Sequence, residues 1–417
     1  MNSSAHSRKP RIAFAIPSLA SGGAGRVVLG VARGLADRGH QIDIVLFRTS
    51  IHHPEEVPDK ARLFVVDDAP DRITKSKPGY AALRARITVV DSHVRRFGWL
   101  HLARALKWHP LVLPTRIQYR QACQMANYID KQKPDIVFTT LTRSILSTLF
   151  ARRLLDNPPP VVPIIQGVIE KHRKHKQIRY RALFPDAAHV VAVSNGVADS
   201  IAEGIGVPRS ALTTIYNPVV SPELDALKSQ TPDHPWFTDN GPPVILGCGR
   251  LIELKGFTVL IKAFARLVER QQYRLIILGT GPQQKELENL IARLNLQGKV
   301  SLPGHTDNPF AFMSRAKLFV LSSRTEGLPT ALIEALACGC PCVSTDCPSG
   351  PAEILQGGEI GPLVPIGDHA ALADAMARTL NNPPDKRKLL ERAGFFSVEK
   401  SVQMYEHLIL ENLGRRK

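Results

Sequence analysis

Positions 324–335 of the chain read Arg-Thr-Glu-Gly-Leu-Pro-Thr-Ala-Leu-Ile-Glu-Ala. The residues just before them, 318–323, are an apolar run of strand length, and residues 331–337 are strong helix formers that stop before Gly339. This order predicts a strand, a tight loop and a helix. Pro329 suits the first helical position, because the N–H that proline lacks is not needed there. The stretch therefore indicates an α/β unit in which a helix closely follows a strand.

The start of this helix is expected to attract an anion, because its first N–H groups and its dipole offer a site for phosphate. Two carboxylates flank the position, Glu326 on the loop and Glu334 in the second helical turn. Acids suit such a place when they accept hydrogen bonds from neutral hydroxyls. A sugar nucleotide combines phosphates with hydroxyls, and the alternative is a pair of solvated surface glutamates.

This pattern resembles the Glu, seven residues, Glu motif of the retaining family 4 glycosyltransferases of GT-B fold, with the Glu-Gly-Leu-Pro run at 326–329 and the Glu-Ala pair at 334–335. The resemblance implies an α/β protein of two Rossmann-like domains facing a cleft, with a C-terminal helix that crosses back to the first domain. It implies that Glu326 holds sugar hydroxyls and Glu334 the ribose. The donor is then expected to contact Gly327, Leu328, Pro329 and Thr330.

A cationic loop precedes this stretch. Residues 249–256 read Gly-Arg-Leu-Ile-Glu-Leu-Lys-Gly, so that Gly249 and Gly256 bound a loop with Arg250 and Lys255 five positions apart. Two such cations can grip one diphosphate from two sides, and the alternative is a salt-bridged surface loop. The loop matches the donor-phosphate element of family 4. The resemblance implies that both cations stabilise the leaving diphosphate in place of a metal.

The catalytic residues expected from this resemblance are Arg250, Lys255 and Glu326, with no metal and no cofactor. The co-substrate would be a nucleoside diphosphate sugar, and UDP is the family's usual nucleotide. No nucleophile is expected on the protein, because the family is usually discussed as front-face substitution. In that scheme the leaving phosphate takes the acceptor proton.

Further glycine loops are expected to complete the donor site. In the resembled fold the nucleotide base rests near loops such as those with Gly279 and Gly281, and with His305. His305 itself is more typical of a loop histidine than of a catalyst. In the first half, residues 21–26 form a loop after a strand at 11–17, but their spacing is not Gly-x-Gly-x-x-Gly and indicates a tight turn. The resemblance implies that Gly22 and Gly23 approach the donor diphosphate or the acceptor.

The length of 417 residues predicts two domains, and the 44% hydrophobic and 22% charged residues are those of a soluble globular protein. We expect an acceptor-binding domain at 1–220, a nucleotide-sugar-binding domain at 221–395 and a terminal helix at 396–417. Residues 219–242 are rich in Pro and have the composition of a linker. No apolar run reaches the roughly 18 residues that span a bilayer.

The positive charge is concentrated in the first half. Residues 1–220 contain 32 Lys and Arg against 16 Asp and Glu, a net +16, so that +1 of the total +17 remains for the rest. This asymmetry indicates an anionic partner, which could be phospholipid, a phosphorylated acceptor or nucleic acid. Residues 95–108, with Trp99 and Trp108, predict a basic amphipathic helix that suits either a membrane interface or its own domain. The charged stretch 170–176 is either a solvated loop or a phosphate-binding loop.

Two motifs give information on the acceptor, and the cysteines indicate the cellular compartment. The run Pro-Ser-Gly-Pro at 348–351 is similar to family 4 enzymes that build lipopolysaccharide and lipid-linked oligosaccharides. Many members carry a His after the fourth strand, where this chain has Thr-Thr-Leu-Thr-Arg at 139–143, so the acceptor-side contact stays open. The six cysteines form no Cys-x-x-Cys pair and are expected to be small buried thiols of a reducing, cytoplasmic protein.

The sequence therefore predicts a retaining, metal-independent glycosyltransferase that moves a hexose or N-acetylhexosamine to a lipid-linked, lipopolysaccharide or polysaccharide acceptor. It would work as a peripheral protein on an anionic membrane surface, at the cytoplasmic face of the inner membrane. A GT-B sugar-nucleotide epimerase or phosphorylase stays open. A basic nucleic-acid-binding protein is disfavoured, because no aromatic and basic platform or recognition helix accompanies the charge.

Overall fold

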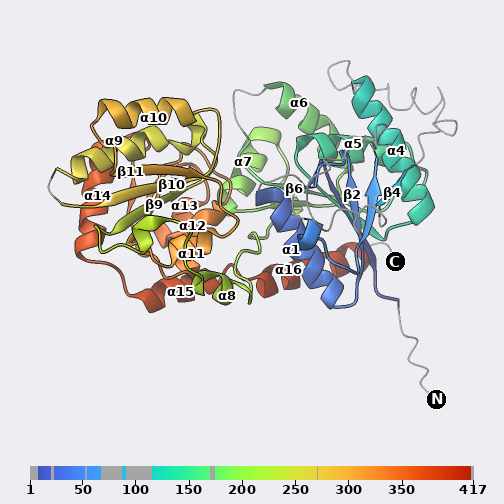
Figure 1. Cartoon of the computed structure of the whole chain (residues 1–417). Coiled ribbons are helices and arrows are strands. Elements are labelled where there is room, and N and C mark those ends of the chain that lie inside the picture. The colour runs from blue at the N-terminus through green and yellow to red at the C-terminus, as the bar shows by residue number, and fades with distance from the viewer. Residues whose placement is uncertain are drawn as a thin grey trace. The chain divides into compact units, whose positions relative to one another are not determined.

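A computed structural model describes residues 8–19, 23–51, 54–66, 87–90, 115–169, 174–269 and 271–414. The chain divides into two compact units (Figure 1). Unit 1 contains residues 1–193, 197–216 and 401–417, and unit 2 contains residues 194–196 and 217–400. The divisions at 216/217 and 400/401 lie a few residues from the expected 220/221 and 395/396. The reason is that Val219 and Val220 donate backbone hydrogen bonds to Phe396, which keeps 217–220 with unit 2.

Unit 1 is built on a parallel sheet whose described strands follow the order β4-β3-β2-β1-β5-β6-β7-β8. Most of these strands are largely apolar and buried, as in a parallel sheet covered on both faces. The strands are β1 (Arg11–Ile16), β2 (Gln41–Leu46), β3 (Arg62–Val65), β4 (Ile87–Val89), β5 (Ile136–Thr140), β6 (Val161–Ile165), β7 (Val190–Ala192) and β8 (Leu212–Thr214). The described helices are α1 (Gly23–Asp37), α4 (Arg116–Gln132), α5 (Thr142–Arg153), α6 (Lys174–Leu183), α7 (Asn195–Ile205) and α16 (Val398–Gly414).

The last helix, α16, packs against the core of unit 1. Tyr405 is fully buried and meets the ring of Phe138 of β5 edge-on, with ring centroids 5.4 Å apart. Gly34 of α1 allows a close approach, because a β-carbon there would lie 2.4 Å from a methyl of Val402. Glu406 accepts from Arg38 at 2.7 Å and contacts His40 at 2.9 Å. Apolar packing and an ion-paired rim therefore both hold α16 on unit 1.

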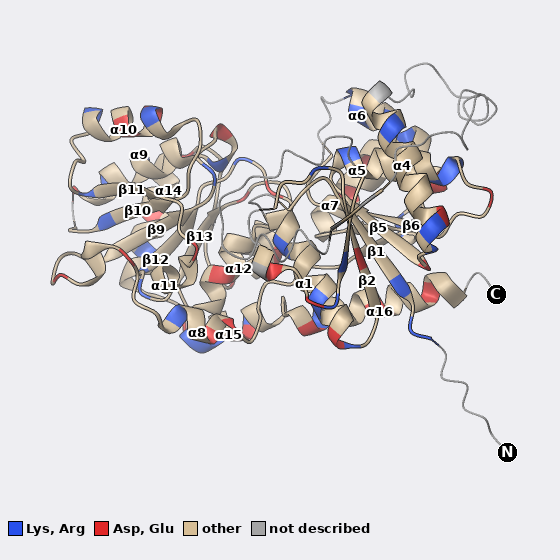
Figure 2. Cartoon of the chain, turned by 45° about the vertical axis from the view of Figure 1, so that its right-hand side comes forward, with Lys and Arg blue, Asp and Glu red and all other residues tan. Residues whose placement is uncertain are grey.

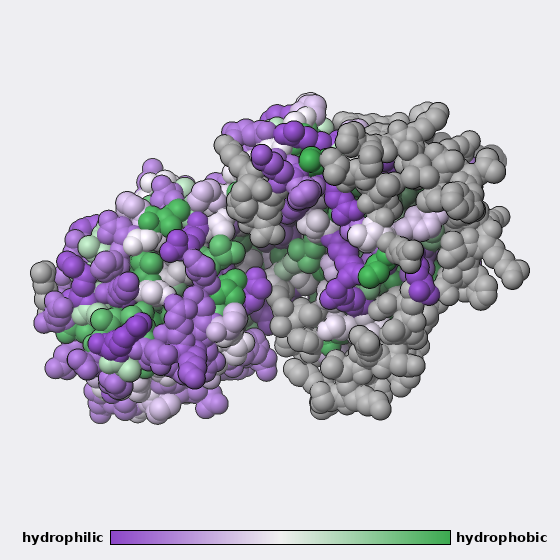
Figure 3. Space-filling model, turned by 90° about the horizontal axis from the view of Figure 1, so that it is seen from above, coloured by the Kyte–Doolittle hydropathy of each residue, from purple (hydrophilic) through white to green (hydrophobic). Residues whose placement is uncertain are grey.

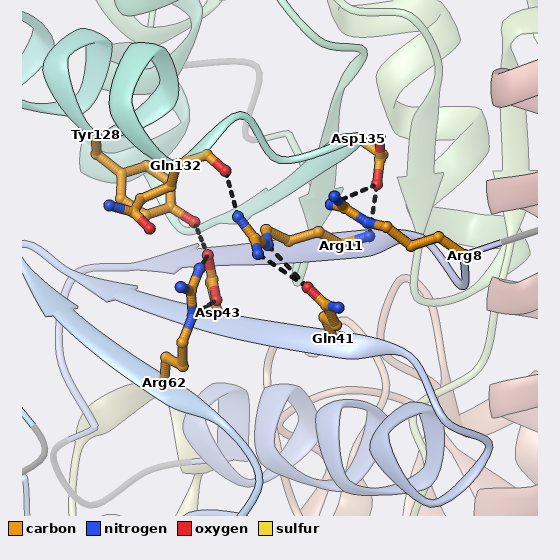
Figure 4. A network of polar contacts seen from close by, with 8 residues as sticks. All are labelled: Arg8, Arg11, Gln41, Asp43, Arg62, Tyr128, Gln132 and Asp135. Carbon is orange, nitrogen blue, oxygen red and sulfur yellow. Dashed lines mark hydrogen bonds and ion pairs between the residues drawn. The ribbon is translucent and has the colours of Figure 1, made fainter.

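A buried polar network ties β2 to its neighbours (Figure 4). Asp43 is fully buried and accepts two hydrogen bonds from Arg62, at 2.8 and 2.7 Å, and one from the Tyr128 hydroxyl at 2.6 Å. Burial and the neighbouring carboxylate raise the pKa of Tyr128 well above its ordinary value, so that the hydroxyl stays a donor. Beside it, Arg11 donates to the side chain of Gln41 at 2.9 Å. The buried charge is thus matched by donors, as its stability requires.

Unit 2 has a second parallel sheet, of order β11-β10-β9-β12-β13-β14. Its core joins this sheet to α9 and α14, with Phe264, Leu260 and Met376 fully buried. The strands are β9 (Val244–Cys248), β10 (Arg274–Leu278), β11 (Val300–Gly304), β12 (Leu318–Leu321), β13 (Cys342–Thr345) and β14 (Leu363–Val364). The helices are α8 (Leu224–Ser229), α9 (Phe257–Leu267), α10 (Gln284–Arg293), α11 (Pro309–Met313), α12 (Thr330–Ala337), α13 (Pro351–Ile354), α14 (His369–Asn381) and α15 (Lys386–Gly394).

Three local expectations were wrong. Residues 219–242 are part of unit 2 and include α8, because Asn308, Ser314 and Arg315 donate to the carbonyls of 227–230. Helix α1 begins at Gly23, inside the expected loop 21–26, and α6 begins at Lys174, inside the expected loop 170–176. The glycines at 22, 23 and 25 and the charged residues at 170–176 are typical of loops, but in both places the helix begins within the stretch.

The described surface is largely hydrophilic on the side shown in Figure 3, with apolar residues scattered among polar ones. Among the described residues, no helix combines the length and the apolarity needed to cross a membrane. The expected helix at 95–108, with its two tryptophans, lies outside the described residues.

Candidate functional site

The site in unit 2 lies where the order of the strands reverses. Strand β9 is followed along the chain by β10 on one side and later by β12 on the other, and it pairs with both. Ligands of such open parallel sheets bind outside the carboxyl ends of the strands at this reversal. The loop 249–256 leaves the carboxyl end of β9, and the stretch 322–329 leaves that of β12. The two motifs that the sequence singled out therefore start from neighbouring strands.

Lys255 and Glu326 form the centre of this site. The Lys255 ammonium donates to Glu326 Oε1 at 2.6 Å, and the side chains are 23% and 11% exposed. The hydroxyl of the buried Ser323 donates to the same oxygen at 2.6 Å. Glu326 is thus fixed by two donors, and the second carboxylate oxygen has no hydrogen-bond partner recorded among the described residues. A cation and an acid are held side by side in a site that water reaches only in part.

Glycines let the lysine loop lie against β12. Gly256 has a φ of 65°, and a β-carbon there would lie 2.0 Å from the carbonyl oxygen of Ser322. Ser322 in turn donates its hydroxyl to the Lys255 carbonyl at 2.9 Å. The stem of Lys255 lies across Gly249, 3.5 Å from where a β-carbon would stand. The close contact and the φ of 65° explain the glycine at 256, and the φ of 156° explains the glycine at 249.

The loops after β9, β10 and β11 are joined by their backbones. Gly249 N–H donates to Leu278, Leu251 N–H to Thr280 and Gly279 N–H to Gly304. Gly279 and Gly281 stand close to the first loop, because their β-carbons would lie 2.0 Å from the Gly249 carbonyl oxygen and 2.4 Å from that of Leu251. The structure brings these predicted glycines together.

The start of α12 is anchored through the carbonyl of Gly327. The hydroxyls of Ser349 and Ser194 donate to this oxygen at 2.8 and 2.9 Å. Gly350 has a φ of 87°, and a β-carbon there would lie 2.6 Å from the ring of Pro329. Pro329 has an extended ψ of 98° and caps the helix, which begins at Thr330. The expectation that Pro329 opens the helix was wrong by one residue, because this cap turns the chain first.

Three other predicted residues have no recorded place in the Lys255–Glu326 ion pair, and each has a position of its own. Arg250 is exposed on the lysine loop. Glu334 is half-buried one turn into α12. His305 is 55% exposed and lies 3.3 Å from Asp307, as a loop histidine.

Cys347 lies close enough to Glu326 and Lys255 for their charges to affect its pKa. Burial, and after it the Glu326 carboxylate, raise the pKa of this thiol to about 12. It is therefore a neutral thiol near neutral pH and not a nucleophile. Five of the cysteines are buried and Cys248 is half-buried, in agreement with the expectation of small packed thiols.

In unit 1, the expected loop residue Gly22 lies outside the described residues, and Gly23 is exposed at the first position of α1. The stretch 139–143 ends β5 and starts α5. Leu141, between β5 and α5, has a φ of 66° and a ψ of 141°, a backbone conformation that residues other than glycine rarely adopt. The reversal of strand order in unit 1 lies here, between β1 and β5.

Sequence reasoning missed Ser323, Ser349 and Ser194. Ser323 was taken as the end of a strand, and Ser349 as part of a subgroup motif. The only sequence signal for Ser349 is its place before Gly350, since a Ser-Gly pair permits the two successive positive φ angles found here. Ser194 is far away in sequence and could not be linked to Gly327 without coordinates.

Comparison with known proteins assigns the family. Residues 231–394 match the family profile described as glycosyl transferases group 1, and residues 22–218 match one described as glycosyl transferase 4-like domain. The chain belongs to the group 1 glycosyltransferases. The family expected from residues 249–256 and 324–335 is thereby confirmed, and Lys255 and Glu326 lie within the matched residues 231–394.

One relative of this group 1 glycosyltransferase is an uncharacterized glycosyltransferase of Methanocaldococcus jannaschii. The two proteins are 36% identical over 199 residues, and the match covers 40% of this chain and 49% of that protein. A second is the N-acetylgalactosamine-N,N'-diacetylbacillosaminyl-diphospho-undecaprenol 4-alpha-N-acetylgalactosaminyltransferase of Campylobacter jejuni, 31% identical over 200 residues, or 48% of this chain and 53% of that protein. The chain thus spans about half the length of these curated relatives.

The fold is shared over nearly the whole chain. The crystal structure of Anabaena HepE in complex with UDP matches with a TM-score of 0.68 and 17% identity, covering 96% of this chain and 100% of that one. Together with the two parallel sheets, this likeness confirms the GT-B fold.

Proposed function

We propose that this group 1 glycosyltransferase moves a hexose or N-acetylhexosamine from a uridine diphosphate sugar to an acceptor, with retention of anomeric configuration. The observation that carries the proposal is the Lys255–Glu326 pair, 2.6 Å apart at the carboxyl ends of β9 and β12. One partner offers a cation to a diphosphate, and the other accepts hydrogen bonds from sugar hydroxyls. Support for UDP is that Anabaena HepE, of the same fold, is complexed with it.

Lys255 and Arg250 stabilise the leaving group in this proposal. The acceptor hydroxyl attacks the anomeric carbon while the bond from that carbon to the β-phosphate oxygen breaks. The acceptor proton passes to the departing phosphate oxygen, so that no protein nucleophile is needed. Negative charge grows on the diphosphate in this step, and fixed cations aimed at it lower the barrier. The reaction then needs no metal ion and no cofactor.

Glu326 and the start of α12 position the sugar. The Ser323 hydroxyl and the Lys255 ammonium hold Oε1 of Glu326, which leaves Oε2 to accept from a sugar hydroxyl. The first N–H groups of α12 add dipolar stabilisation of the diphosphate. Glu334 binds the ribose, and the joined loops with Gly279 and Gly281 hold the base through their backbones.

We propose a lipid-linked or lipopolysaccharide or polysaccharide acceptor that is reached on an anionic membrane surface. The support is the net charge of +16 over residues 1–220 and the diphospho-undecaprenol substrate that the name of the Campylobacter relative states. Each Lys or Arg near such a surface contributes about 1 kcal/mol. Sedimentation with anionic and zwitterionic vesicles tests this part. Binding should require anionic lipid and weaken with salt, and recovery in the supernatant throughout would contradict it.

A donor screen tests the main proposal. Thermal unfolding is followed with UDP-glucose, UDP-galactose, the two UDP-N-acetylhexosamines, GDP-mannose and UDP, and the stabilising donor is then incubated with and without a lipid-linked glycan. We expect a UDP sugar to raise the melting temperature, and an α-linked product and free UDP to form only with acceptor. Conversion of the donor to another sugar nucleotide without acceptor would identify an epimerase instead. Stabilisation by no nucleotide would contradict the proposal.

A further inference from the structure

We propose that Ser349 and Ser194 are positioning residues for the donor, which hold the peptide group between Gly327 and Leu328 so that its N–H faces the diphosphate. The inference rests on the proposed function, because it assigns two further residues to the donor site. Neither serine has to touch the donor itself, because the group that they orient belongs to the backbone.

The stretch 325–337 has no side chain that attracts a diphosphate by charge. It contains two acids, Glu326 and Glu334, and neither Lys nor Arg. Figure 2 shows no basic residue on α12. This stretch can therefore serve a diphosphate only through neutral donors, chiefly its backbone N–H groups.

The N–H groups of Gly327 and Leu328 suit this task because the fold does not use them. Both residues are buried, and neither N–H has a hydrogen-bond partner recorded among the residues that the structure describes. Buried backbone N–H groups are almost always paired, so two unpaired ones indicate a ligand with acceptor oxygens. They directly follow Glu326, the acid of the proposed sugar site.

The carbonyl of Gly327 and the N–H of Leu328 belong to one planar peptide group, which is trans. The two groups point in opposite directions, so that holding the oxygen also aims the N–H. Ser349 and Ser194 donate their hydroxyls to this oxygen at 2.8 and 2.9 Å. These hydrogen bonds polarise the peptide group, which makes its N–H a stronger donor to a phosphate oxygen.

Ser349 has a costly backbone conformation. Its φ is 75°, in the left-handed region that serine rarely adopts, and Gly350 follows with a φ of 87°. A β-carbon at Gly350 would lie 2.8 Å from the Gly327 oxygen and 2.6 Å from the ring of Pro329, so this turn lies directly against the peptide group. Backbone strain of this kind persists where the surrounding structure requires it, and it is often found at functional sites.

Ser194 belongs to unit 2 and is held through its sequence neighbours. The backbone N–H groups of Asn195 and Gly196 donate to the Glu353 carboxylate at 2.9 and 2.8 Å. A β-carbon at Gly196 would lie 2.8 Å from that of Ser349, so the segments that carry the two serines are in direct contact. Contacts outside the site therefore fix both serines, as a positioning role requires.

The two serines can replace one another in part. Their hydroxyl oxygens are 2.6 Å apart, and each hydroxyl has a single hydrogen to donate. When both donate to the carbonyl, no hydrogen is left for the contact between them, so either hydroxyl can turn to the other while one still holds the carbonyl. Loss of one serine should therefore weaken the arrangement, and loss of both should release it.

The test titrates UDP into the full chain by calorimetry and follows urea unfolding of the same proteins. The variants are Ser349→Ala, Ser194→Ala, the double alanine variant and Ser349→Gly. The glycine variant is decisive, because it loses the hydroxyl and also the strain of a positive φ, so that its stability returns toward that of the wild type. Ser314→Ala is the matched control, since Ser314 also donates its hydroxyl to a backbone carbonyl of unit 2, that of Lys228, at 2.8 Å.

We expect Ser349→Ala and Ser349→Gly to bind UDP about 2- to 10-fold more weakly than the wild type, the loss for one neutral hydrogen bond. The double variant should lose more than the two single losses combined, because no hydroxyl then holds the carbonyl. Ser314→Ala should unfold at a lower urea concentration and bind UDP like the wild type. If Ser349→Ala does not fold, Ser349→Gly and Ser194→Ala decide.

Recovery of UDP affinity together with stability in Ser349→Gly would show that the serine is merely structural and would overturn the inference. Equal affinity of all variants, or a double variant no weaker than the single ones, would overturn it as well. In these results the wild type still binds UDP, so the proposed function stands. A wild type that binds no UDP would overturn the proposed function and this inference with it.

Discussion

The ammonium of Lys255 and the carboxylate of Glu326 are 2.6 Å apart, although the two residues are 71 positions apart in sequence. Strands β9 and β12 are hydrogen-bonded neighbours, so the loops that follow them leave the sheet at the same edge. The pair is therefore a product of topology, and the glycine at 256 is the local adaptation that lets the lysine loop lie against the end of β12.

Glu326→Gln should lower kcat/KM for the donor by about 10- to 100-fold, because an amide accepts more weakly from sugar hydroxyls than a carboxylate. The variant keeps an oxygen for Ser323 and should melt close to the wild type. Glu286→Gln, at an exposed site on α10, is the control. Unchanged kinetics of Glu326→Gln with a well-folded protein would remove Glu326 from the site.

Arg250→Ala should slow turnover at saturating donor by about 10²- to 10³-fold, by analogy with the loss of one transition-state donor. Arg250→Lys should recover part of this rate, since a lysine keeps the charge but not the bidentate fork. Arg266→Ala, an exposed arginine of α9, serves as the comparison. A normal rate for Arg250→Ala would mean that the diphosphate is held without it.

Comparison of Gly256→Ala with Gly357→Ala separates the cost of a positive φ from the cost of a steric clash with Ser322. Both glycines have φ near 65°, but a β-carbon at Gly357 would meet nothing within 4 Å, whereas one at Gly256 would lie 2.0 Å from the Ser322 carbonyl. Urea unfolding should show a loss of about 1–2 kcal/mol for Gly357→Ala, the cost of a left-handed conformation. The loss for Gly256→Ala should be clearly larger. Equal losses would show that the loop does not press on β12 as described.

Glu406→Gln tests how α16 is held. The hydrogen bond from His40, and then that from Arg38, lower the pKa of Glu406. A carboxylate with a lowered folded pKa contributes stability above its unfolded pKa, and this stability is lost as the pH falls through the folded value. At pH 7 the variant should be about 1–2 kcal/mol less stable than the wild type. The gap should begin to close as the pH drops below about 4.5, where the unfolded carboxyl takes up its proton, and should vanish once the folded Glu406 is protonated as well. A gap independent of pH would contradict this, and Glu411→Gln on the same helix is the control.

The sequence predicted the class of fold because its strands are uninterrupted apolar runs, such as Ile-Ala-Phe-Ala-Ile at 12–16 and Val-Ile-Leu at 244–246, which are typical of a parallel sheet buried on both faces. Arg250 and Lys255 were found because Gly249 and Gly256, both of positive φ, bound their loop. Glu326 was found because it opens the Glu-Gly-Leu-Pro run that resembles the family motif. Ser194 and Ser349 could not be found in this way, since their shared partner is a backbone carbonyl at Gly327 that has no sequence signature.

The contacts of helix α4 were also beyond sequence reasoning. Arg143 donates to Gln121 and Arg179 donates to Gln118, and nothing in the sequence links these pairs. The charge excess predicted an anionic partner but could not say which bases act together. Similarly, the fold at 219–242 depends on donors from 308–315, so its composition alone indicated a linker.

The central claim is that Lys255, which Glu326 holds in place, binds the donor diphosphate without a metal ion. The most direct measurement is a calorimetric titration of UDP, in EDTA, into the wild type, Lys255→Ala and Lys262→Ala, the last being an exposed lysine on α9. The account predicts that UDP binds the wild type and Lys262→Ala alike, and Lys255→Ala about 10- to 100-fold more weakly. Equal affinity for all three proteins, or binding that appears only when Mg²⁺ or Mn²⁺ replaces EDTA, would contradict it.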